Sequence, residues 1–150
     1  MDIKYTNGED PDFIRLCEKL DHYLNRLAGG EENRKAYIPL NATAGIRDVY
    51  VVYDEDTPIA CSGFKHHSDK TAEIKRVFVE EAHRNKGIAK QMMRLLEAMA
   101  KKKGYERLVV ETGRDMAGAL VLYRSLGYTV IPNYEPYDCL PNSICMEKEL

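Results

Sequence analysis

The chain has 150 residues, 44% of them hydrophobic and 31% charged. This composition supports a buried core and a polar surface, which excludes disordered and fibrous proteins and fits one domain over residues 1–150. A net charge of -2 provides no field for nucleic-acid binding. The apolar runs are too short for a membrane-spanning helix, and the first residues do not resemble a secretory signal, so we expect a cytoplasmic protein without membrane contacts.

The cysteines stand at positions 17, 61, 139 and 145 and form no C-x-x-C pair. The spacing therefore predicts neither a zinc ribbon nor a redox motif. Cys17 and Cys61 fall in apolar patterns and are expected to be buried free thiols. Cys139 and Cys145 would bind a metal only if the fold brought them to His66 or His67, so we expect no metal site.

The first half of the chain predicts one helix and a group of strands. A weak strand pattern covers residues 3–5. Asp10 and Pro11 are typical of a helix start, apolar residues then recur at helical spacing to residue 27, and Gly29 and Gly30 end the helix. Residues 31–45 show no period and are expected to form a long loop. A hairpin follows over residues 49–53 and 59–64, and a further strand over 72–79 after a turn at 65–71.

The second half predicts helices over residues 85–103 and 115–126 and strands over 108–110, 128–131 and 143–147. Gly104 and Gly127 end the two helices. The resulting order is β-α-β-β-β-α-β-α-β-β. It predicts an α/β (α+β) fold with a mixed, mostly antiparallel twisted sheet flanked by helices.

The turn between the strand at 72–79 and the next helix is the most informative segment. Unpaired N–H groups of a first helical turn, small residues at Gly87 and Ala89, and cations nearby are typical of an anion site suited to a pyrophosphate. Neither a Walker sequence nor a Rossmann glycine pattern occurs. The alternative is an ordinary strand–helix turn with solvated cations at Arg84, Lys86 and Lys90.

These residues resemble the GNAT superfamily of acyl-CoA-dependent N-acetyltransferases. Arg84, Gly87 and Ala89 match its signature Arg/Gln-x-x-Gly-x-Gly/Ala, which follows a strand as in the family. Residues 73–79 are similar to the family's central strand. Residues 111–113 and 122–128, with Ala119, are similar to its second conserved block, so the resemblance covers roughly residues 49–150.

The resemblance implies acetyl-CoA as cosubstrate and no metal. It implies that backbone amides after a bulge in the central strand, at Phe78 and Val79, hold the thioester arm. The remaining implied cofactor contacts are Arg84, Asn85, Lys86, Gly87, Ile88, Ala89, Lys90, Ala119 and Tyr123.

Three residues are the catalytic candidates. Tyr123 matches the family's general acid, because a phenol is protonated at neutral pH and can protonate a leaving thiolate; the alternative is a core aromatic. Glu73 is the first candidate base, directly or through water, and the alternative is an ion pair with Lys75 or Lys70. Glu111 is a second candidate base or an anchor for a cationic acceptor.

The acceptor is expected to be a small amine, since Glu73 and Glu111 favour a cation. Tyr134, Tyr137 and Asn41 are expected near the cleft, while His66 and His67 are expected to be solvated beside a turn. The sequence leaves open whether the chain forms a homodimer. It also leaves two other classes open, a non-catalytic acyl-CoA sensor and a partner-binding domain.

Overall fold

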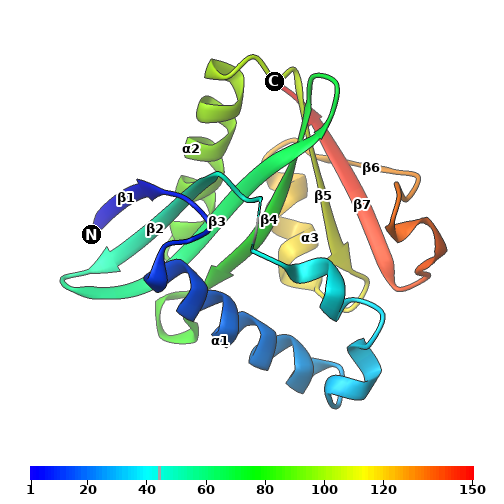
Figure 1. Ribbon diagram of the computed structural model, residues 1–150, viewed down its shortest axis with the longest axis horizontal. Helices are drawn as coiled ribbons and strands as arrows, with labels where there is room; N and C mark the ends of the chain where they lie inside the picture. Colours follow the sequence, from blue (N-terminus) through cyan, green and yellow to red (C-terminus); the bar gives the residue numbers. More distant parts are fainter. Residues whose placement is uncertain (44) are drawn as a thin grey trace.

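The computed structural model describes residues 1–43 and 45–150 as a seven-stranded sheet with helices on both faces (Figure 1). The expected element order and fold class are confirmed. The main elements are β1 (Asp2–Thr6), α1 (Pro11–Leu27), β2 (Asp48–Asp54), β3 (Thr57–Ser68), β4 (Thr71–Val79), α2 (Ile88–Lys102), β5 (Arg107–Gly113), α3 (Ala117–Ser125), β6 (Thr129–Ile131) and β7 (Ser143–Glu149).

The sheet opens at its centre, between β4 and β5. The strands lie in the order β1-β2-β3-β4-β5-β7-β6, and β4 and β5 form a parallel pair within an otherwise antiparallel sheet. Their pairing ends at Ile74 and Val110, although β4 continues to Val79 and β5 to Gly113. Within the described chain, the edge of β4 that faces β5 therefore has no strand partner beyond Ile74.

A β-bulge in β4 coincides with this opening. Gly63 of β3 pairs with Lys75 and Cys61 pairs with Phe78, so β4 carries one residue more than β3 between the two pairs. Arg76 lies in the bulge with a φ of 60°. Its guanidinium Nη2 donates to the Cys17 carbonyl and to Asp21 Oδ1, each at 2.8 Å. The bulge is thus attached to α1.

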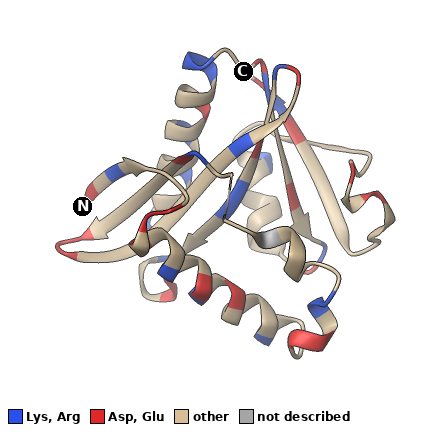
Figure 2. Ribbon diagram, viewed as in Figure 1, with Lys and Arg blue, Asp and Glu red and all other residues tan. Residues whose placement is uncertain are grey.

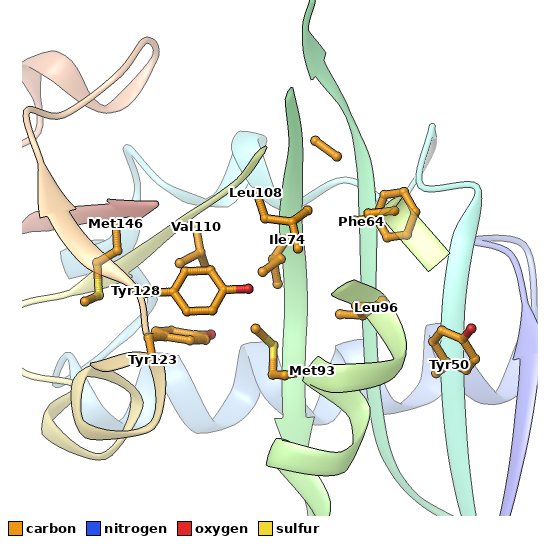
Figure 3. Close-up of a cluster of buried hydrophobic side chains, with 12 residues drawn as sticks. Tyr50, Phe64, Ile74, Met93, Leu96, Leu108, Val110, Tyr123, Tyr128 and Met146 are labelled. Atoms are coloured by element: carbon orange, nitrogen blue, oxygen red, sulfur yellow. The ribbon is translucent and has the colours of Figure 1, made fainter. Parts of the chain in front are cut away.

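The helices bury their apolar stripes on opposite faces of the sheet. Asp10 caps α1, accepting from the backbone N–H groups of Asp12 (2.9 Å) and Phe13 (3.1 Å). The other face carries α2 and α3, where Met93 and Tyr123 pack with Ile74 (Figure 3). The apolar residues of α1 pack over β2, β3 and the end of β4; the buried ones are Phe13, Leu16, Cys17 and Leu20.

The turn expected at residues 65–71 is present but shorter, since it comprises only Asp69 and Lys70. β3 continues to Ser68, and only Asp69 and Lys70 separate it from β4. The polar residues before them stay extended because β4 pairs with them, for example Lys65 with Glu73. Pairing with a neighbouring strand here overrides the polar composition that suggested a turn.

Two other boundaries also differ from expectation. The loop expected at 31–45 contains two short 3₁₀-helices, η1 (Glu31–Arg34) and η2 (Ile38–Asn41), while Ala44 lies outside the described residues. Helix α2 begins at Ile88 rather than at residue 85 because Asn85 and Gly87 have φ values of 62° and 78°. Left-handed residues cannot belong to a right-handed helix.

Candidate active site

The first backbone N–H groups of α2 have no hydrogen-bond partner among the described residues. A 3₁₀-helix, η3 (Glu81–His83), follows β4, and Gly87 then caps α2 in the left-handed conformation without a side-chain hydrogen bond. Among described residues, a Cβ added to Gly87 would meet no atom within 4 Å. The turn therefore presents open space in front of unpaired donors at the positive end of the helix dipole.

A cavity of about 640 Å³ adjoins this turn, a size typical of cofactor sites. Three segments line it: the end of β4 with the turn and the start of α2, one side of α3 with the residues before it, and one face of α1. The structure thus brings together two blocks that are separate in sequence. Most of the expected cofactor contacts line this cavity, namely Phe78, Val79, Arg84, Asn85, Gly87, Ile88, Ala89, Lys90 and Ala119, whereas Lys86 is exposed in the turn and does not.

Arg84 makes two contacts on the wall of this cavity. Its Nε donates to the Val79 carbonyl at 2.9 Å. Its guanidinium carbon lies 4.5 Å from the ring centroid of Tyr23 on α1, at cation–π distance. The cation is therefore held beside the turn rather than free in solvent.

A second cavity, of about 140 Å³, lies where β4 and β5 separate, and Tyr123 lines it. Tyr123 is 4% exposed, and its ring packs on Tyr128 at 5.8 Å between centroids (Figure 3). No described residue hydrogen-bonds its hydroxyl. Burial, and secondarily the nearby Glu111 carboxylate, raises the pKa of Tyr123, so the phenol stays protonated.

Both candidate carboxylates line the same small cavity. Glu73 accepts a hydrogen bond from the Tyr134 hydroxyl at 2.9 Å, and Glu111 accepts one from the Ser143 hydroxyl at 2.7 Å. Burial raises the pKa of Glu111, and the bond from Ser143 opposes that rise. Within the described residues Glu73 forms no ion pair with a lysine, so its carboxylate remains available to the cavity.

The remaining candidates divide between this region and the surface. Tyr137 lines the small cavity. Tyr134 does not line it, but its hydroxyl donates a hydrogen bond to Glu73, which does. His67 lies near the end of β3, just before the turn, and is half-buried rather than solvated, with its ring 4.8 Å from that of Tyr134. His66 is exposed, with Nδ1 3.1 Å from the Tyr105 hydroxyl. The Asn41 side chain lies outside the described part of the structure.

The cysteines do not gather into a site. Cys17, Cys61 and Cys145 are buried free thiols, whereas Cys139 is exposed. Over residues 1–43 and 45–150, no three His, Cys, Asp or Glu side chains cluster in a way that could hold a metal ion. The helices of the same ranges include none with the length and hydropathy needed to cross a membrane.

Comparison with known proteins identifies the family. The model of the Acetyltransferase (GNAT) family matches residues 16–128. The chain belongs to this GNAT family. An IAA acetyltransferase of Azospirillum brasilense is 30% identical over 138 residues, covering 91% of this chain and 90% of that protein. The uncharacterized N-acetyltransferase YsnE of Bacillus subtilis is 36% identical over 101 residues, covering 65% and 66%.

Solved GNAT structures share the fold. A GNAT family acetyltransferase from Elizabethkingia anophelis with acetyl-CoA bound superimposes with a TM-score of 0.63 at 27% identity, covering 77% of this chain and 83% of that one. The resemblance stated from sequence is thereby confirmed, and the chain is an acyltransferase of the GNAT type.

Sequence reasoning missed part of the lining. Leu20, Tyr23 and Leu27 of α1 line the larger cavity. Their helical spacing predicts only that they belong to the core. Lys75 lines the smaller cavity and was considered only as a partner for Glu73. A helical period shows which face is apolar, but it does not show what that face covers.

Proposed function

We propose that the chain transfers the acetyl group of acetyl-CoA to a primary amine of a small acceptor by direct attack. The observation that carries this proposal is the position of Tyr123 at the opening between β4 and β5. The larger cavity adjoins the smaller one there, and both are lined by Met116 and Ala119. A thioester entering from the larger cavity would meet an acid and two carboxylates.

The cofactor arm has a matching place along β4. The unpaired backbone groups after the bulge are the donors and acceptors that an extended pantetheine needs, and we assign the amides of Phe78 and Val79 to this role. We assign the pyrophosphate to the N-terminus of α2 at Gly87, with Arg84 adding positive charge. A backbone donor aimed at the thioester oxygen would also stabilise the developing oxyanion.

The chemistry needs a neutral amine, which attacks the thioester carbonyl and forms the C–N bond. The C–S bond then breaks, and the thiolate takes a proton from the Tyr123 hydroxyl. The proton lost by the amine goes to a carboxylate, directly or through water. Glu73 and Glu111 remain alternative bases, since both line the cavity and neither forms an ion pair with another described residue.

The test combines calorimetric titration of acetyl-CoA with measurement of thiol release over a panel of primary amines. We expect acetyl-CoA to bind and at least one small amine to release CoA with formation of the N-acetyl product. Binding without release on any amine would favour the acyl-CoA sensor. Absence of binding would overturn the assignment of the cofactor site.

A further inference from the structure

Lys75 places a buried ammonium group in the smaller cavity. The residue is 8% exposed and lies on β4 immediately before the bulge. Its Nζ donates to the Leu40 carbonyl at 3.2 Å and to the Tyr137 hydroxyl at 3.0 Å. Both partners are neutral, and an ammonium has three donors, so one donor is left for a further acceptor.

The charge of Lys75 is not compensated by a salt bridge. Among the described residues, no carboxylate oxygen lies within 4 Å of its Nζ. Buried charges in proteins are paired or hydrogen-bonded to charged groups, because removing them from water is costly. Lys75 is therefore a buried cation in the wall of the cavity that forms no salt bridge with a described residue.

The other buried cations near the cavity hold α1 in place through hydrogen bonds or a salt bridge. Arg76 is paired with Asp21 on α1. Arg34 donates through Nη1 to Asn25 Oδ1 at 2.6 Å and to the Asp21 carbonyl at 3.4 Å, so it holds η1 against α1. Among the described cations, only Lys75 combines burial, neutral partners and a place in the wall of the smaller cavity.

Two carboxylates line the same small cavity as Lys75, so the cavity offers both signs of charge to a zwitterion. Glu73 and Lys75 are two residues apart on one strand face, a backbone rise of about 6.6 Å. Glu111 lies on the opposite side of the opening, on β5 (Figure 2 shows positive charge on β4 and negative charge on β5). A ligand with an amine and a carboxylate would place the amine near the carboxylates and its own carboxylate at Lys75.

The size of the cavity limits that ligand. Its volume is about 140 Å³, well below the roughly 300–1,000 Å³ of sites for drug-sized molecules. Extending the proposed amine acetylation, we propose that Lys75 binds the carboxylate of the acceptor and that the acceptor is a free amino acid. Lys75 is then a specificity-determining residue, and a peptide amino terminus, which lacks an adjacent carboxylate, is a poor acceptor.

The experiment measures equilibrium binding to the CoA-loaded protein, which requires no turnover. The probes are the common L-amino acids, each with its carboxamide and its decarboxylated amine. We expect at least one amino acid to bind roughly 10- to 100-fold more tightly than both of its analogues, the range of a charge-assisted hydrogen bond. Lys75→Met should remove this preference while CoA affinity is retained, and Lys75→Arg should restore part of it.

Lys102→Met is the matched control, because Lys102 is exposed in the last turn of α2. This substitution should leave the preference for the amino acid over its analogues unchanged. The inference is overturned if no amino acid binds better than its analogues, or if Lys75→Met weakens all three probe classes equally. The proposed function fails separately, when acetyl-CoA binds but no amine releases CoA. Release from simple amines with no carboxylate preference would retain the transferase and reject the role of Lys75.

Discussion

At the residue scale, the proposed chemistry centres on Tyr123, a buried side chain that lines the smaller cavity and forms no hydrogen bond with a described residue. Tyr123→Phe should lower kcat by ~10²–10⁴-fold, because the ring remains and only the proton donor is lost. CoA affinity should stay close to that of the parent. The free energy of unfolding should change by at most ~1 kcal/mol, since no observed hydrogen bond is broken. Stopped assays of thiol release, calorimetry and a urea titration measure the three quantities.

The control for this substitution is Tyr128→Phe. Tyr128 packs on Tyr123 in the same core, and its buried hydroxyl has no partner among described residues. Removing that hydroxyl should leave kcat unchanged and should not destabilise the protein. Equal losses of kcat in the two variants would indicate that both tyrosines only pack the core.

The raised pKa of the Glu111 carboxyl leads us to predict that the free energy of unfolding depends on pH. Burial raises its pKa, so just above the ordinary carboxyl value of ~4.3 the folded protein keeps a proton that the unfolded chain has lost. The stability of the parent relative to Glu111→Gln should therefore fall as pH rises through this window and be flat below it. Denaturant titrations of both proteins between about pH 3.5 and 7 measure the difference. A difference that rises with pH would contradict the raised pKa.

At the scale of elements, the turn into α2 is where we propose that the cofactor binds. Gly87→Glu places a carboxylate where we assign the pyrophosphate, and we expect CoA affinity to fall below detection by calorimetry because of both volume and charge. The left-handed φ of 78° adds a backbone cost of about 1–2 kcal/mol.

Gly104→Glu is the control that separates the block of CoA binding from the backbone cost of a left-handed residue. Gly104 follows the other end of α2, with a φ of 95° and no atom within 4 Å of an added Cβ. It should carry the same kind of backbone cost and leave CoA affinity intact. CoA affinity that survives Gly87→Glu would place the phosphates elsewhere.

At the scale of the whole molecule, the proposed cofactor site joins separate parts of the fold, so ligand binding should stabilise all of it. Acetyl-CoA at about 100 times its Kd should add ~2.7 kcal/mol and raise Tm by about 5–10 °C. The rise should shrink with added salt, because the assigned contacts are largely to phosphate. A thermal melt with and without acetyl-CoA at two salt concentrations tests this. A salt-independent rise would contradict an electrostatic site.

The sequence by itself determined the features that depend on neighbouring residues. The stripe of α1 with its cap at Asp10, the order of strands and helices, and the spacing of Arg84, Gly87 and Ala89 are all local. Helical periods, caps and turn residues act over a few positions, so they can be interpreted without knowing the rest of the chain.

Only the tertiary structure decided what lies across the opening of the sheet. The end of the β4–β5 pairing at Ile74 and the strand conformation of His67 depend on partners distant in sequence. The same holds for Lys75, whose ammonium meets Tyr137 from a segment 62 positions away. No local pattern encodes such distances, because strand pairing and the burial of a charge are set by the chain that folds against them.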